Sequence, residues 1–82
     1  MEVLKVQRWQ ERISVDPDIH HGDPCIKGTR IPVRILVGSL ADGMTFVQIL
    51  ENYPQLTEAD IFAALGYAAE VLRQDVLLPL SS

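Results

Sequence analysis

The chain changes character within residues 28–33, Gly-Thr-Arg-Ile-Pro-Val. Gly28 can adopt backbone angles that other residues resist, whereas Pro32 suits the first turn of a helix but not its middle. After Pro32 the apolar residues recur at helical spacing. They are Val33, Leu36, Val37 and Leu40. Gly43 then occupies the place of a left-handed helix cap. This stretch therefore predicts a helix over residues 33–42, with strand or loop before it.

Two further helices are predicted downstream, and both open with a capping pattern. Thr45 and Gln48 have the spacing of a capping box, and Thr57 and Asp60 repeat the device. The predicted helices are 45–52 and 57–78. Their apolar faces, together with that of the first helix, predict one shared core. Its expected members are Leu36, Leu40, Ile49, Leu50, Ile61, Leu65 and Leu72.

Upstream of Gly28 the sequence favours a short β-ribbon. Residues 12–15 alternate polar and apolar side chains, and residues 25–27 can return as the second strand. Two short strands are marginal alone, so the ribbon must pack on the helices. The fold class is therefore mainly α: a three-helix homeodomain-like or helix-turn-helix bundle preceded by a short β-ribbon. Residues 1–11 are interpreted as an N-terminal arm, and residues 12–80 as one helix-turn-helix-like domain.

The size of the chain favours assembly with a second copy. A domain of 82 residues buries only about 60–65% of its unfolded surface, so its core is marginal. We expect a homodimer, since apolar side chains remain on the last helix and after it. The candidate dimer contacts are Phe62, Tyr67, Leu77, Leu78 and Leu80. No apolar run reaches the length of a membrane span and no signal peptide is evident, so we expect a cytoplasmic protein without a membrane partner.

One polar loop contains residue types that bind metals. His20, His21, Asp23 and Cys25 fall within six positions, but a structural zinc site needs four ligands, usually as two spaced pairs. No second pair follows, so we interpret this stretch as a polar loop beside a buried thiol. The sequence predicts no metal site, no cofactor and no catalytic residue, and hence no enzyme.

The charges are distributed unevenly along the chain. Six of the seven basic residues precede position 35, so an anionic partner is expected to meet the N-terminal half. The candidate contacts for an anion or a protein partner are Trp9, Arg12, Lys27, Thr29, Arg30 and Arg34. Trp9 and Ile31 are expected to be apolar anchors beside the arginines. For Arg30, solvated charge and a hydrogen bond to backbone carbonyls of the ribbon are alternatives.

Several motifs resemble one known family. They are the runs Arg12–Pro17, Gly22–Val33, Gly43–Thr45, Tyr53–Thr57 and Ala63–Ala68. Together they are similar to the domain-of-unknown-function 433 family, over roughly positions 12 to 72. The resemblance implies a small bacterial or cyanobacterial protein with a homeodomain-like helical fold. It also implies an antitoxin, paired with a toxin of the PIN-like nuclease type.

Two functions follow from these observations. The first is an antitoxin-like interaction protein that binds and inhibits a PIN-like nuclease toxin. The second is a helix-turn-helix regulator that binds operator DNA and represses its own operon; a small metal-dependent enzyme is a third alternative. The first turns of the last helix argue against major-groove reading, because they contain Glu58 and Asp60 and no basic residue.

Overall fold

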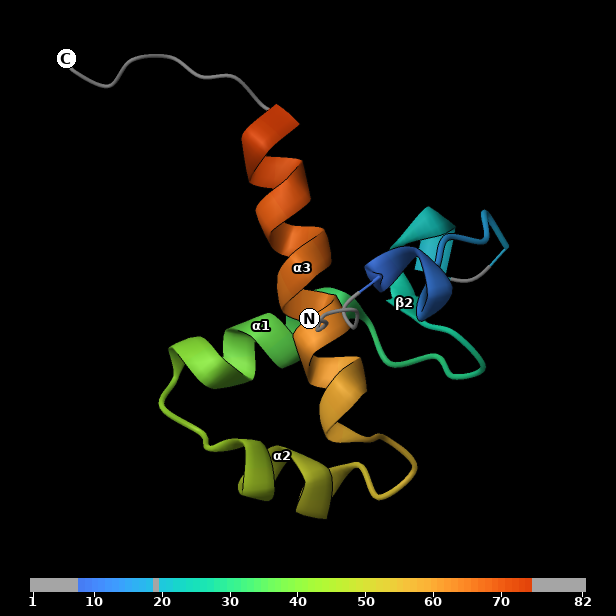
Figure 1. Cartoon of the computed structure of the whole chain (residues 1–82). Coiled ribbons are helices and arrows are strands. Elements are labelled where there is room, and N and C mark those ends of the chain that lie inside the picture. The colour runs from blue at the N-terminus through green and yellow to red at the C-terminus, as the bar shows by residue number, and fades with distance from the viewer. Residues whose placement is uncertain (1–7, 19, 75–82) are drawn as a thin grey trace, which may run out of the picture.

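A computed structural model describes residues 8–18 and 20–74, and Figure 1 shows their arrangement. The three helices are α1 (Val33–Ala41), α2 (Phe46–Asn52) and α3 (Glu58–Gln74). The two strands are β1 (Ile13–Ser14) and β2 (Cys25–Ile26), and the 3₁₀ turns are η2 (Trp9–Glu11) and η3 (His20–Gly22). The prediction of a mainly helical fold with a short ribbon is confirmed. Within the described part of the chain, no helix is both long and apolar enough to cross a membrane.

The helix boundaries follow from the capping residues. Pro32 is the N-cap of α1, with φ −70° and ψ 146°, so it lies one residue before the first helical turn rather than within it. Gly43 has φ 97°, a left-handed angle that glycine adopts without strain, and the chain turns there as predicted. The capping box of α2 is also confirmed. The Gln48 amide donates to the Thr45 hydroxyl at 3.1 Å, and the Gln48 side chain accepts from the Thr45 amide at 2.9 Å.

The ribbon is antiparallel, with Ile13 opposite Ile26 and Ser14 opposite Cys25. This confirms the predicted pairing of residues 12–15 with residues 25–27. On its other side Cys25 forms an antiparallel bridge with Pro32, so β2 lies between β1 and the segment that leads into α1. The ribbon is thereby fixed to the start of the first helix.

The core lies where α1, α2, the ribbon and the first turns of α3 meet. The first turns of α3 are at the bottom of Figure 1 and are called its lower turns, and the last ones are called its upper turns. Leu36, Ile49 and Ile61 are completely buried, as predicted. Three other expected members are partly buried and pack against this core. They are Leu40, Leu50 and Leu65.

The prediction for Leu72 was wrong, because its side chain is 72% exposed. The reason is helix length: α3 has 17 residues and α1 has 9, which at about 1.5 Å per residue gives about 25 Å against about 13 Å. The upper turns of α3 therefore extend past the helices that cover its lower half (Figure 1). Residues 75–78, which the sequence assigned to this helix, lie outside the described residues.

Candidate functional site

The turn between β2 and α1 is held by glycine and threonine. The Thr29 amide donates to the Ile26 carbonyl at 2.9 Å, which closes a four-residue turn, and Gly28 has φ 82° at its third position. A β-turn with a positive φ at that position favours glycine. The Thr29 hydroxyl donates to the Ile26 carbonyl at 2.8 Å and accepts from the Ile31 amide at 3.0 Å. Thr29, a predicted partner contact, thus stabilises the turn.

Thr29→Val is expected to lower the free energy of unfolding by about 1–2 kcal/mol, because valine keeps the shape but loses both hydrogen bonds of the hydroxyl. Thr29→Ser, which retains the hydroxyl, is the matched control and should stay close to wild type. Urea unfolding followed by circular dichroism measures both variants. Equal losses in the two variants would mean that the hydroxyl does not stabilise the turn.

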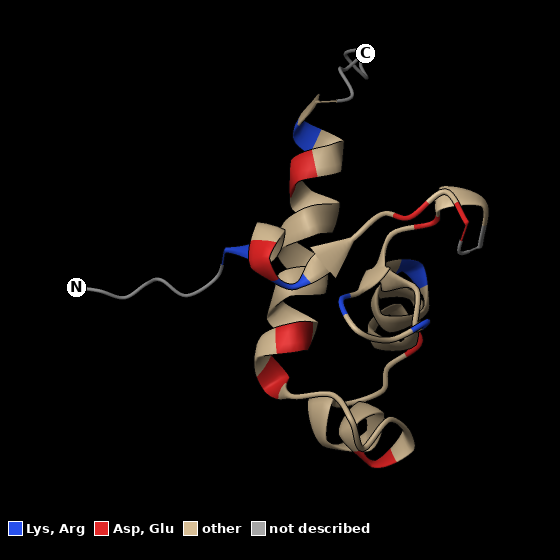
Figure 2. Cartoon of the chain, turned by 90° about the vertical axis from the view of Figure 1, so that its right-hand side faces the viewer, with Lys and Arg blue, Asp and Glu red and all other residues tan. Residues whose placement is uncertain are grey.

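Three basic residues lie around the beginning of α1, on and beside this turn. Lys27 and Arg30 are exposed, and Arg34 is in the first turn of α1 with its side chain 67% exposed. The Arg34 Nε donates to the Asp23 carboxylate at 2.8 Å. Figure 2 shows blue segments at the start of α1 and in the loop before it. We call Lys27, Arg30 and Arg34 the basic cluster.

Arg12, another predicted contact, is engaged inside the molecule. Its Nη1 donates to the Asp60 carboxylate at 3.1 Å, and the Asp60 side chain is only 11% exposed. The second oxygen of Asp60 accepts from the Thr57 amide at 2.9 Å and from the Thr57 hydroxyl at 3.2 Å. Asp60 thus forms its half of the predicted capping box, but the Thr57 hydroxyl does not, because the Asp60 amide donates to the Thr57 carbonyl at 2.9 Å instead. Asp60 also fixes the ribbon end to α3. The pairing with Arg12 was not foreseen from the sequence.

Trp9 and Ile31 were expected to be apolar anchors. Ile31 is buried in the core, so it is not available to a partner. Trp9 is partly buried and meets Tyr67 edge-on, with ring centroids 5.1 Å apart and planes at 78°. Its side chain also covers Gly66, where an added Cβ would lie 3.5 Å from Trp9 Cδ1. Trp9 therefore attaches η2 to α3, and residues 8–11 pack as part of the domain.

Of the five predicted dimer contacts, the structure describes Tyr67 and Phe62. Tyr67 packs against Trp9, and Phe62 is 45% exposed with its ring 5.2 Å from that of Phe46. Leu77, Leu78 and Leu80 lie outside the described residues.

The histidine and cysteine loop forms no ligand cluster among the described residues, where no three His, Cys, Asp or Glu side chains come close enough to hold a metal ion. Cys25 is buried, and its thiol donates to the Asp23 carbonyl at 3.4 Å. Burial, and then the negative charge of Asp23, raise the pKa of the Cys25 thiol. A thiol that stays protonated is a poor nucleophile and a poor metal ligand. His21 is exposed.

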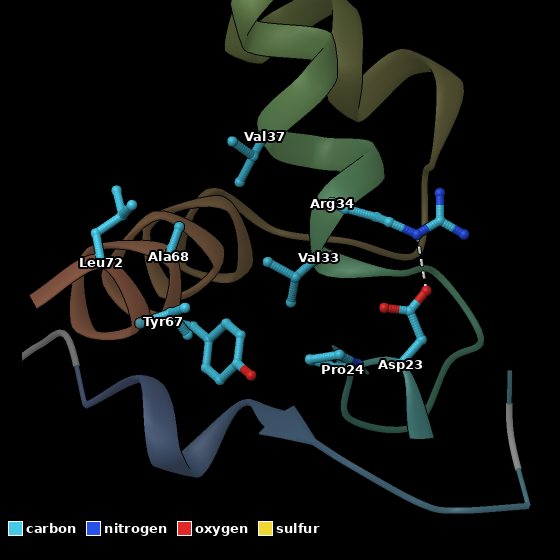
Figure 3. Close-up of a pocket in the computed structure, with 9 residues that line it drawn as sticks. Asp23, Pro24, Val33, Arg34, Val37, Tyr67, Ala68 and Leu72 are labelled. Atoms are coloured by element: carbon cyan, nitrogen blue, oxygen red, sulfur yellow. Dashed lines mark hydrogen bonds and ion pairs between the residues drawn. The ribbon is translucent and has the colours of Figure 1, made fainter. Parts of the chain in front are cut away.

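An apolar groove that the sequence did not reveal runs between α1 and the upper turns of α3. Its volume is about 370 Å³, within the range of small-ligand pockets. The residues that line this α1/α3 groove are Asp23, Pro24, Val33, Arg34, Val37, Tyr67, Ala68, Val71 and Leu72. Figure 3 shows the two valines of α1 on one side of the groove and Tyr67, Ala68 and Leu72 of α3 on the other. The Arg34–Asp23 ion pair lies at its edge.

A second hollow lies beside the turn between β2 and α1. It has a volume of about 790 Å³ and lies between residues 14–17 and residues 28–30. Arg30 lines this hollow, whereas Arg34 lines the α1/α3 groove. One arginine of the basic cluster therefore lines each hollow.

These features define a small helical domain with a β-ribbon and two hollows, each lined by an arginine of the basic cluster. The chain belongs to the family described as "Protein of unknown function (DUF433)", whose model matches residues 13–68. This confirms the family resemblance seen in the sequence motifs.

Two relatives support the family assignment. The chain is similar to a crystal structure of a DUF433 member protein from Anabaena variabilis, with a TM-score of 0.71 and 38% identity, covering 79% of this chain and 64% of that one. It is also 37% identical over 59 residues to the uncharacterised protein y4eO of Sinorhizobium fredii. That match spans 72% of this chain but only 27% of the relative, so the chain covers about a quarter of that protein.

Proposed function

We propose that this chain is a non-enzymatic, cytoplasmic antitoxin-like protein that binds and inhibits a PIN-like nuclease. One observation carries the proposal: each of two hollows, one of them apolar, is lined by an arginine of the basic cluster. Energetic centres of protein interfaces combine arginines with apolar pockets. This surface offers both, and it lies within the stretch that the family model matches.

The chemistry of the basic cluster suits a nuclease mouth. The active site of a PIN-like nuclease resembles a cluster of carboxylates that holds divalent metal. The entrance to that site is therefore negatively charged before the metal binds. A guanidinium can pair with a carboxylate through two parallel hydrogen bonds. Arg34 already pairs with Asp23, but exposed ion pairs contribute little to stability, so Arg34 can exchange this partner for one on the nuclease. Arg12 is less suited to bind a partner, because its guanidinium is paired with the Asp60 carboxylate.

The test begins with the reading frames next to the gene of this chain, one of which should encode a PIN-like nuclease. Its purified product is titrated with the full chain, and both binding and residual nuclease activity are measured. The double variant Arg30→Ala/Arg34→Ala should bind at least about tenfold more weakly and inhibit correspondingly less. Arg8→Ala is the matched control, since Arg8 is also an exposed arginine in an ion pair, with Glu11 at 3.8 Å. Wild-type binding by the double variant would contradict the proposal.

DNA binding is the second candidate, favoured by the pairing of α2 with α3 across a short linker and by the same basic cluster. The first turn of α3 does not suit base reading, because Asp60 is buried in the Arg12 network and Glu58 is acidic. DNA would therefore contact the basic cluster. Duplex DNA replaces the nuclease in the same titration, at several salt concentrations. A salt slope lowered by about two in Arg30→Ala/Arg34→Ala would favour this candidate.

A further inference from the structure

One face of α3 remains accessible along nearly the whole helix. It consists of two adjacent rows with steps of four residues, Glu58–Phe62–Gly66 and Leu65–Ala69–Arg73. Leu65 and Gly66, at the middle, are partly buried, and the other four residues are exposed. Because successive residues of a helix are about 100° apart, all six lie within a sector of about 100° around its axis. We call this surface the exposed α3 face.

We propose that a second copy of this chain packs on the exposed α3 face, with the two α3 helices antiparallel and a twofold axis between Leu65 and Gly66. Each copy then offers the same face, as a twofold contact requires. This homodimer does not depend on the nuclease proposal, because no residue of the exposed α3 face lines either hollow.

The two rows match each other under this axis. Residues four apart on a helix form ridges, and helices pack by placing a ridge of one into a groove of the other. In the antiparallel pair, positions equally far from the axis face each other, so each row lies along the other row of the second copy. The facing pairs are Glu58 with Arg73, Phe62 with Ala69, and Gly66 with Leu65.

The charges at the ends of the face favour this orientation. Figure 2 shows red segments in the lower turns of α3 and a blue segment near its upper end, where Arg73 is the basic residue of the last turn. Antiparallel helices bring Glu58 of each copy to Arg73 of the other, whereas parallel helices would bring like charges together. Arg73 already donates to Glu70 at 2.7 Å, but its side chain is 71% exposed and has further N–H groups to donate.

The sizes of the side chains at the centre match as well. Phe62 is 45% exposed and faces alanine, and Leu65 faces glycine, so each large side chain meets a small residue, as in interdigitated cores. The surface at Gly66 is also apolar, because an added Cβ would lie 3.5 Å from the Trp9 ring. Charge and size therefore agree at all three pairs under one axis. A face suited to a different protein has no reason to be complementary to itself, so the occupant we infer is a second copy.

Charge reversal at the ends of the face tests the antiparallel pairing. Sedimentation of the full chain alone, across the micromolar range, should show a wild-type dimer. Glu58→Arg and Arg73→Glu should each weaken dimerisation at least about tenfold, because each places like charges at both ends of the contact. The double variant Glu58→Arg/Arg73→Glu should dimerise like wild type, since opposite charges face each other again. Glu51→Arg, at an exposed glutamate of α2 outside the face, is the matched control and should also dimerise normally.

A substitution near the centre tests the packing. Ala69→Arg should weaken dimerisation at least about tenfold, because it buries a charge against Phe62 of the second copy. Ala41→Arg, the same change at an exposed alanine that ends α1, is its control and should dimerise like wild type. Both alanines are exposed, so the core stays intact, which circular dichroism can verify.

Three results would overturn the proposal. They are a wild type that stays monomeric, an Ala69→Arg variant that dimerises normally, and a double charge-reversal variant that dimerises as weakly as the single ones. The first would leave the exposed α3 face to a different protein. The last would mean that Glu58 and Arg73 do not face each other.

Discussion

Leu36→Ala is expected to lower the free energy of unfolding by about 2–5 kcal/mol, the range for removing a buried leucine from a packed core. Leu36 is completely buried among α1, α2 and α3. Small domains are stable by only about 5–15 kcal/mol, and a chain of 82 residues is expected near the lower end. Much of the Leu36→Ala chain should therefore be unfolded at physiological temperature. Urea unfolding at low protein concentration measures the loss.

Leu72→Ala is the matched control for Leu36→Ala, because it is the same chemical change at a position that is 72% exposed. It should cost less than about 0.5 kcal/mol, as surface substitutions do. Low protein concentration matters here, since any self-association through Leu72 would add to its apparent stability. Comparable losses for the two leucines would mean that the upper turns of α3 belong to the core, contrary to the fold described above.

Asp60→Ala is expected to cost about 2–3 kcal/mol, the second largest effect. The carboxylate accepts hydrogen bonds from the Arg12 guanidinium and from both the amide and the hydroxyl of Thr57. Removing it takes away the cap of α3 and the connection of α3 to the ribbon, and leaves partly buried donors without an acceptor. Because Arg12 is 46% exposed, the Arg12 guanidinium can turn to water, which keeps the loss below that of a fully buried ion pair.

Two controls separate the parts of the Asp60 effect. Asp60→Asn retains an oxygen that can accept from the Thr57 amide, so it should lose less than Asp60→Ala. Glu58→Ala, at an exposed acidic position in the same turn, should change the stability by less than about 0.5 kcal/mol. If Glu58→Ala destabilised as much as Asp60→Ala, the effect would come from charge at the helix N-terminus rather than from this network.

The fold was largely predictable because its determinants are local. The capping patterns at Thr45/Gln48 and Thr57/Asp60 marked the starts of α2 and α3 within a residue, and Gly43 marked the end of α1 within a residue or two. Exposure was less predictable. Periodicity predicts which face of α3 Leu72 lies on. It does not predict whether that face is covered, because this depends on the length of the neighbouring helices.

The candidate site was only partly predictable, because much of it arises from long-range contacts. The exposure of Lys27, Arg30 and Arg34 is what charged side chains in a loop and on an outer helix face usually have. The Arg12–Asp60 pair joins positions 48 apart, and no local pattern connects them. The α1/α3 groove depends on how two helices diverge, and the contact of Trp9 with Tyr67 depends on how η2 folds onto α3.

Burial changes along the single helix α3. Its lower turns supply Ile61, Ala63 and Ala64 to the core, whereas Val71 and Leu72 beyond them face water. The family model ends at residue 68, near the point where this change occurs. Substitutions at Val71 and Leu72 are therefore expected to cost little free energy of folding. Related chains can differ at these two positions, while the first turns of α3 continue to specify the same fold.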